Sequence, residues 1–268
     1  MGSIVFAIAA VTVIGALCAV MLSIASKVMA VEVDERVERL REILPGANCG
    51  ACGQAGCDGY AAALAEGAKA NLCTPGGPEV ARRLSEALGV VFEDVATKVA
   101  VLRCRGDCTV REDKMAYVGV HSCVAARQLF GGQSACAYGC IGFGDCAKAC
   151  PNGAIRIING IARINTAVCT GCGMCAGTCP NKLITVESDT IKTVVGCSNP
   201  EGGAAVRKVC KQGCIACGRC QRECPAEAIL IEGNLAKIDY AKCNGCGHCA
   251  EICPTKCIQQ ASFAGIYN

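Results

Sequence analysis

The sequence contains no tryptophan, only two histidines and 4 % aromatic residues, and its formal net charge is +3. Nucleic-acid binding relies on a basic surface that neutralises phosphates and on aromatic rings that stack on bases. Both are scarce here, so we expect no nucleic-acid partner. The chain also lacks a strand followed by a G-x-G-x-x-G turn, a P-loop, and a grouping of acid, base and nucleophile. No catalytic residue and no nucleotide-binding motif are therefore predicted.

Cysteine, in contrast, accounts for 27 of the 268 residues. Much of it falls into C-x2-C-x2-C-x3-C-P blocks, the bacterial ferredoxin run, in which three close thiolates bind one [4Fe–4S] cube and the fourth reaches the neighbouring cube. A zinc site would use two C-x2-C pairs and leave the other cysteines unexplained. Disulfides do not suit an odd cysteine count in such steps. The sequence therefore predicts an iron–sulfur electron carrier. Complete blocks stand at Cys169, Cys172, Cys175 and Cys179; at Cys214, Cys217, Cys220 and Cys224; and at Cys243, Cys246, Cys249 and Cys253.

The cysteine blocks repeat with a constant offset of 74 residues, which matches Cys140 with Cys214, and also Cys136 with Cys210 and Cys123 with Cys197. Two ferredoxin modules therefore stand in tandem. Between the blocks of each module lies an apolar hairpin signal with a two-residue turn. The predicted fold class is α+β, with strands at 155–158, 161–164, 229–231 and 235–238.

Cross-ligation between neighbouring blocks predicts three complete cluster sites in the modules. They are Cys150, Cys169, Cys172 and Cys175; Cys214, Cys217, Cys220 and Cys253; and Cys224, Cys243, Cys246 and Cys249.

The fourth module site has a gap. Position 143, where the repeat predicts a cysteine, is Phe143, which leaves the three thiolates of Cys140, Cys146 and Cys179. Cys136, four residues before Cys140, is the nearest replacement. The alternative is a three-iron [3Fe–4S] cluster.

A separate motif, C-x2-C-x4-C-x15-C, supplies Cys49, Cys52, Cys57 and Cys73 for one more [4Fe–4S] cluster. Glycines between these cysteines permit a tight wrap. A helix near 59–67 and a turn at 75–78 are expected to close the site. A zinc knuckle has similar spacing, but the adjacent ferredoxin blocks favour iron.

These five sites account for twenty cysteines, and the remaining ones leave two interpretations open. Either a sixth cluster binds between the motifs, or the cysteines are buried free thiols that pack as small apolar side chains. Cys18 and Cys257 are predicted to have no ligand role. The candidate ligands of the sixth cluster are Cys104, Cys108 and Cys123 with one of Cys136, Cys197 or Cys210.

Residues 4–24 carry no charge and are long enough to cross the hydrocarbon core as a helix. No basic residue precedes the run, which argues against a cleaved signal peptide. Because Lys27 and several arginines follow it, the positive-inside rule places the rest of the chain in the cytoplasm, anchored to the cell inner membrane by a single span. A short amphipathic helix should follow, ending before Pro45. The predicted domains are 1–28, 29–95, 96–190 and 191–268.

A family resemblance rests on the stretch VDERVERLREILPGANCGACGQAGCDGYA, on its position after an uncharged helix, and on the Cys73-Thr74-Pro75-Gly76-Gly77 turn. In these features the chain resembles the B-subunit family of Rnf complexes, which are ion-translocating ferredoxin:NAD oxidoreductases. The resemblance covers essentially the whole chain. It implies a membrane-anchored subunit that accepts electrons from reduced ferredoxin and passes them to other Rnf subunits. Polyferredoxin subunits of hydrogenases or formate dehydrogenases share the modules, and a zinc scaffold would share only the cysteines. A basic group near 207–222 is a candidate docking surface for acidic ferredoxin.

Overall fold

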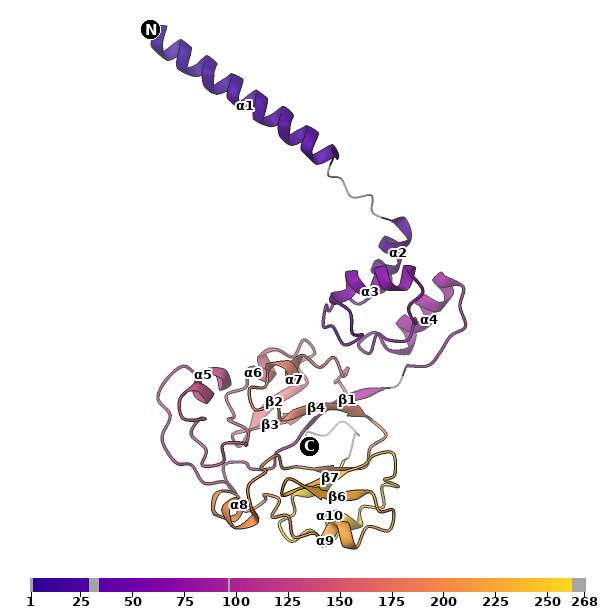
Figure 1. The fold of residues 1–268 in the computed structure, drawn as a ribbon, viewed down its shortest axis with the longest axis vertical. Coiled ribbons are helices and arrows are strands. Elements are labelled where there is room, and N and C mark those ends of the chain that lie inside the picture. Colours follow the sequence, from indigo (N-terminus) through magenta and orange to yellow (C-terminus); the bar gives the residue numbers. More distant parts are fainter. Residues whose placement is uncertain (1, 29–33, 96, 262–268) are drawn as a thin grey trace.

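The computed structural model describes residues 2–28, 34–95 and 97–261. Figure 1 shows a long N-terminal helix that projects from a small helical domain, followed by a larger α+β part in which two similar modules lie together. This arrangement agrees with the predicted fold class.

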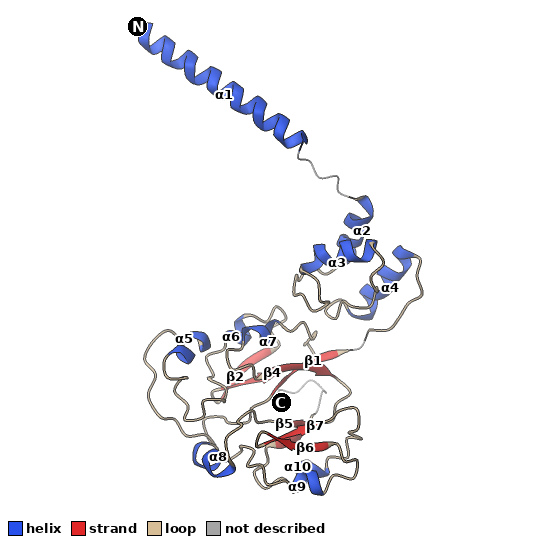
Figure 2. Ribbon diagram, viewed as in Figure 1, coloured by secondary structure: helices blue, strands red, loops and turns tan. Residues whose placement is uncertain are grey.

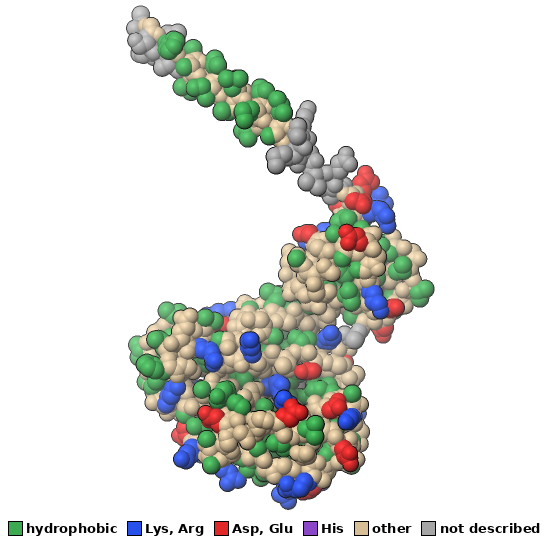
Figure 3. Space-filling view, in the orientation of Figure 1, with side chains coloured by type: hydrophobic (Ala, Val, Ile, Leu, Met, Phe, Trp, Pro, Cys, Tyr) green, Lys and Arg blue, Asp and Glu red, His purple; other side chains and the backbone are tan. Residues whose placement is uncertain are grey.

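The first helix, α1 (Gly2–Val28), is apolar on all sides because its sequence contains no charge before Lys27. Its segment Ile8–Ser26 has a mean hydropathy of 2.5 and none of it is buried against the protein. Figure 3 shows the apolar side chains around it. By length and composition this helix can span a membrane.

Three helices build the small domain: α2 (Glu35–Ile43), α3 (Gly56–Ala65) and α4 (Gly77–Leu88). The Asp34 side chain caps α2, and the helix ends before Pro45, as predicted. A core of Leu40, Tyr60 and Leu84 joins the three helices. The sequence analysis expected only a turn around 75–78 and did not predict α4, which begins within it.

The first module contains two small antiparallel sheets (Figure 2). Strand β1 (Lys98–Leu102) pairs with β4 (Ile184–Ser188), and β2 (Ile155–Ile158) pairs with β3 (Ile161–Ile164). Its helices are short: α5 (Cys123–Gln128), α6 (Asp145–Lys148) and α7 (Met174–Thr178).

The second module has the same plan. Strand β5 (Thr193–Val195) pairs with β8 (Ile258–Gln260), and β6 (Ile229–Glu232) pairs with β7 (Leu235–Ile238). Its helices are α8 (Gly203–Val209), α9 (Arg219–Arg222) and α10 (His248–Ile252).

Both predicted hairpins are confirmed, and their turns explain the register. Asn159 and Gly160 have φ angles of 51° and 69°, and Gly233 and Asn234 have 56° and 59°. Two consecutive residues with positive φ form the type I′ turn, whose twist matches that of antiparallel strands.

Each module has its own apolar core, and a third apolar cluster joins the modules. Outward-facing Val99 and Val101 of β1 pack with Ile191 and with Val194 of β5. The two modules therefore share a buried interface that runs beside β1 and β5.

Candidate metal centres

The third cysteine of each ferredoxin block is positioned by a recurring local structure. A glycine with a left-handed conformation precedes a short helix, and the cysteine is the second residue of that helix. Residues other than glycine rarely adopt this backbone conformation, so the glycine lets the chain turn sharply around the site. The pairs are Gly144 with Cys146, Gly173 with Cys175, Gly218 with Cys220, and Gly247 with Cys249.

In the first module, one cavity is lined by the first three cysteines of one block together with the last cysteine of the preceding block. These are Cys169, Cys172 and Cys175 with Cys150. Backbone amides point at the sulfurs. The Ala100 amide donates to Cys169 Sγ at 3.3 Å, and the Ala154 amide donates to Cys150 Sγ at 3.3 Å.

The second module contains two such groups. One cavity is lined by Cys214, Cys217, Cys220 and Cys253, with the non-motif Cys257 beside them. The other group consists of Cys224, Cys243, Cys246 and Cys249. Burial raises the pKa of Cys249 to about 11, and the nearby charges of Cys243, Cys246 and Cys224 raise it further. The Ala228 amide donates to Cys224 Sγ at 3.4 Å.

At the site with the gap at Phe143, the fourth cysteine that lines the cavity differs from the one predicted. Its cavity is lined by Cys123, Cys140, Cys146 and Cys179. Cys136, which the sequence analysis assigned to this site, lines another cavity instead.

Asp145 explains why Cys123 reaches this site. Its carboxylate accepts hydrogen bonds from the Ser122 hydroxyl at 2.8 Å and from the Val124 amide at 3.1 Å. These bonds hold the start of α5, and hence Cys123, beside Cys146, the residue that follows Asp145. The offset of 74 could not reveal this, because Cys123 lies in a segment that is longer in the first module than in the second.

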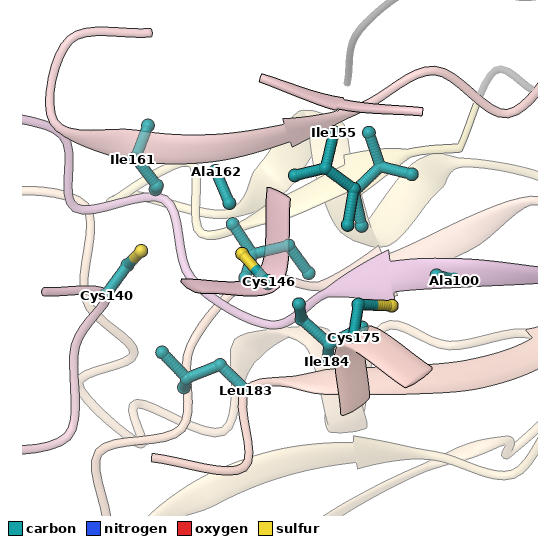
Figure 4. Packing of buried hydrophobic residues seen from close by; sticks show 11 residues of the cluster. Ala100, Cys140, Cys146, Ile155, Ile161, Ala162, Cys175, Leu183 and Ile184 are labelled. Atoms are coloured by element: carbon teal, nitrogen blue, oxygen red, sulfur yellow. The ribbon is translucent and has the colours of Figure 1, made fainter. Parts of the chain in front are cut away.

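Figure 4 shows how closely the thiols and the core are combined. Cys140, Cys146 and Cys175 lie among aliphatic side chains, including Ile161 of the hairpin and Leu183. Such surroundings limit the access of water to these three thiols.

In the small domain, the four predicted cysteines come together around the start of α3. Burial raises the pKa of Cys73, and the charges of Cys57, Cys49 and Cys52 raise it further. The Asn48 side chain accepts a hydrogen bond of 2.8 Å from the Cys57 amide. Asn48 itself has a φ of 47°, so this turn is held by its side chain.

Burial also raises the pKa of several module thiols, to about 12 for Cys146 and about 11 for Cys175 and Cys220. For these three cysteines, the neutral thiol is therefore the stable form without metal. Because thiolates are the ligands, metal binding must release these protons, and its affinity should fall as pH falls.

The donor set fits [4Fe–4S] clusters. Each site offers four thiols, and backbone amides donate to sulfur at most of them. Asp145 also lines the Phe143 site, but its carboxylate is held by Ser122 and Val124. Within the residues that the structure describes, no group of three or more His, Cys, Asp or Glu side chains is spaced to hold a single metal ion.

Of the remaining cysteines, four line a further cavity between the modules: Cys104, Cys136, Cys197 and Cys210. Cys108, also a candidate ligand of a sixth cluster, is exposed and lines none of the cavities described here. Cys18 lies exposed on α1.

Comparisons with known proteins agree with this arrangement. An Fe-S cluster family model matches residues 44–75, a 4Fe-4S binding domain matches 162–185, and a 4Fe-4S dicluster domain matches 208–254.

Three curated relatives align with most of the chain. The B subunit of a proton-translocating ferredoxin:NAD(+) oxidoreductase complex from Clostridium ljungdahlii is 43 % identical over 91 % of this chain and 87 % of its own. The B subunit of the Na(+)-translocating complex of Acetobacterium woodii is 38 % identical over 92 % and 74 %. The B subunit of an ion-translocating oxidoreductase complex of Methanosarcina acetivorans is 40 % identical over 88 % and 90 %.

Proposed function

Because this chain belongs to the family of B subunits of ion-translocating ferredoxin:NAD oxidoreductase complexes, the Rnf complexes, we propose that it is the membrane-anchored subunit that receives electrons from reduced ferredoxin. It passes them through a series of iron–sulfur clusters to other subunits of the complex. The observation that carries this proposal is the recurrence of groups of four cysteines, which line cavities in both modules and come together in the small domain.

Five sets of four cysteines are the proposed cluster ligands in the small domain and the two modules. When bound, the clusters supply one-electron transfer. The protein contributes the thiolates, the amide donors that stabilise negative charge on sulfur, and the apolar surroundings that limit solvent access. The sets are Cys49, Cys52, Cys57 and Cys73; Cys123, Cys140, Cys146 and Cys179; Cys150, Cys169, Cys172 and Cys175; Cys214, Cys217, Cys220 and Cys253; and Cys224, Cys243, Cys246 and Cys249.

With four thiols around the Phe143 site, that site suits a four-iron cluster without Cys136, so a [3Fe–4S] cluster is not required.

The apolar α1 is the proposed anchor in the cell inner membrane, and the cysteine-rich domains lie on the cytoplasmic side. Lys27, Arg36, Arg39 and Arg41 follow the span, which favours this orientation. A cytoplasmic location also keeps the thiols reduced and places them within reach of ferredoxin. Reduction of NAD belongs to other subunits, because no nucleotide-binding motif occurs in the sequence.

Anaerobic reconstitution followed by rapid mixing with reduced ferredoxin tests this function. We expect the brown protein to bleach as its clusters are reduced, and EPR signals of several [4Fe–4S] clusters to develop in parallel. A protein that contains zinc in place of iron, or clusters that dithionite reduces but ferredoxin does not, would contradict the proposal.

A further inference from the structure

We propose that a sixth [4Fe–4S] cluster binds between the two ferredoxin modules, with Cys104 and Cys136 of the first module and Cys197 and Cys210 of the second as its ligands. The inference rests on the proposed function only in that the protein carries iron–sulfur clusters. The four cysteines come from separate parts of the chain: Cys104 follows β1, Cys136 lies between α5 and α6, Cys197 follows β5, and Cys210 directly follows α8.

The cavity that these thiols line has the size of the others. Its empty volume is about 390 Å³, compared with about 380, 320 and 310 Å³ for the three ferredoxin-type cavities. The number of thiols and the size of the cavity are therefore those of the sites proposed to hold [4Fe–4S] clusters.

Strand register shows that the site has internal symmetry. Leu102 of β1 pairs with Ile184, and Val195 of β5 pairs with Ile258, so the two pairs stand one repeat of 74 residues apart on β4 and β8. The hydrogen bonds that follow agree: the Arg103 amide donates to Leu183 O at 2.7 Å, and the Gly196 amide donates to Cys257 O at 2.8 Å.

Cys104 and Cys197 are consequently equivalent, each two residues after its strand. The constant offset had matched Cys197 with Cys123 instead, because it does not account for the longer segment in the first module. Cys136 and Cys210 are equivalent by the offset itself. Each module therefore contributes the same pair of cysteines to one shared site.

Polar groups around the cavity are arranged for sulfur ligands. The Cys140 amide donates to Cys104 Sγ at 3.4 Å, as amides do at the ferredoxin-type sites. Asn199, which is 2 % exposed, donates its side-chain amide to Cys136 Sγ at 3.6 Å. The buried guanidinium of Arg111 lines the same cavity and bonds to Cys140 O at 2.6 Å. A buried cation offsets the negative charge that four thiolates bring.

Two glycines make room for these sulfurs. A Cβ added at Gly106 would lie 3.3 Å from Cys210 Sγ and 3.8 Å from Cys104 Sγ, and one at Gly139 would lie 3.6 Å from Cys136 Sγ. The backbone can therefore approach the site closely on two sides.

The position of the site gives it a role in electron transfer. The sulfur of Cys104 accepts a hydrogen bond from the backbone amide of Cys140, a proposed ligand in the first module. The sulfur of Cys197 accepts one from the backbone amide of Cys214, a proposed ligand in the second module. The site adjoins one cluster site of each module. A cluster here would connect the two modules into one conducting path and hold them together.

Iron content of the full-length protein after anaerobic reconstitution tests this proposal without reference to ferredoxin. With six [4Fe–4S] clusters the wild type should contain about twenty-four iron atoms per chain, whereas five would give about twenty. A value near twenty, or one zinc atom per chain beside twenty irons, would overturn the sixth cluster and leave the proposed electron-transfer function intact.

Combined substitutions test the ligand set. Cys104→Ala and Cys197→Ala should each lose or convert the same cluster, so that the double variant loses no more than about four irons. Cys123→Ala with Cys197→Ala should affect two clusters and lose up to about eight. The matched control, Cys108→Ala, should retain all iron, because Cys108 does not line this cavity or any of the three ferredoxin-type cavities.

Other patterns would contradict the assignment. Additive iron losses from Cys104→Ala and Cys197→Ala would mean that they serve different sites. Non-additive losses from Cys136→Ala and Cys140→Ala would return Cys136 to the site beside Phe143. EPR signals of the five other clusters report whether each variant has folded.

Discussion

At the scale of single residues, Cys257 shows how one position differs between the modules. It is 2 % exposed, and its equivalent in the first module is the buried Leu183. Its sulfur lies 3.6 Å from Cys253 Sγ, and it also hydrogen-bonds to Cys214. These hydrogen bonds lower the pKa of Cys253 and Cys214 and raise that of Cys257. Once Cys253 and Cys214 are thiolate ligands, Cys257 is the donor, and its single S–H is shared between the two sulfurs.

We expect Cys257→Leu, which introduces the residue of the first module, to lower the reduction potential of the adjacent cluster. Hydrogen bonds to ligand sulfur stabilise the more negative, reduced state, so their loss favours oxidation. A loss of about 1 kcal/mol corresponds to about 43 mV for a one-electron step. EPR during reductive titration measures this shift.

Cys257→Ser provides the control, because its hydroxyl still supplies one donor to the ligand thiolates. Its potential should stay nearer to that of the wild type. Equal shifts in the Leu and Ser variants would show that packing around Cys257, and not its hydrogen bond, sets the potential.

At the scale of elements, the sequence predicted structures whose signals are local. Both hairpins were found because their turns and alternating residues are contiguous, and α2 was found from its period and the following Pro45. Strand β1 was missed because its partner, β4, lies more than eighty residues away in the chain. The same reason applies to Cys123 and Cys136: spacing identifies close cysteines, whereas the sites of these two depend on tertiary packing.

Gly171 illustrates how an element constrains a cluster block. It has a φ of 64°, and a Cβ there would lie 2.4 Å from Lys98 O of β1. Gly171→Ala should therefore destabilise the site of Cys169 and Cys172, because the backbone of β1 must move. Positive φ costs roughly 1–2 kcal/mol for alanine, and the overlap should add about 1–3 kcal/mol. The denaturant midpoint of cluster loss gives the measurement.

Gly153→Ala is the matched control for this prediction. Gly153 has a similar φ of 60° in the same module, but no atom lies within 4 Å of its added Cβ. It should show the backbone cost alone. If both alanine variants lose their clusters at the same midpoint, the close approach of Gly171 to β1 does not matter for stability.

At the scale of the whole molecule, the order of parts was predictable because cysteine motifs and a long uncharged run are strong signals. The family resemblance is confirmed by relatives that align with about nine-tenths of the chain. The domain boundaries remain predictions, although separate apolar cores lie within the three segments after α1. How the modules join was not predictable, because their shared surface is built from short strands and isolated cysteines.

Deleting residues 1–28 should convert the protein from a membrane-bound to a soluble form without loss of iron. The described part of α1 makes no apolar contact with the three domain cores, and its spanning segment is not buried. Fractionation of cells into membrane and soluble parts, with iron analysis of each, checks this expectation. An insoluble, colourless product would show that α1 belongs to the fold.

The basic group of the second module flanks two of the proposed clusters. Arg207 and Lys208 end α8 next to Cys210, and Lys211 follows. Figure 3 shows basic side chains along the edge where α8 and α9 lie. Within the described residues, neither Lys208 nor Lys211 forms a salt bridge, so their charges are available to a partner. Cys217, on the same module, is exposed and would bring a cluster close to that partner.

If acidic ferredoxin docks on this basic group, the double variant Lys208→Glu and Lys211→Glu should slow electron transfer from ferredoxin about tenfold at low salt, because steering by opposite charges raises association rates. Wild-type transfer should slow as ionic strength rises, since charges are screened beyond about 10 Å at 0.1 M salt, and the variant should lose this dependence. Stopped-flow reduction at several salt concentrations measures both effects.

Arg83→Glu with Lys148→Glu changes the net charge equally at exposed positions elsewhere and should leave the rate near that of the wild type. A slower rate in this control, with none in the Lys208 and Lys211 variant, would place ferredoxin on the small domain or the first module instead.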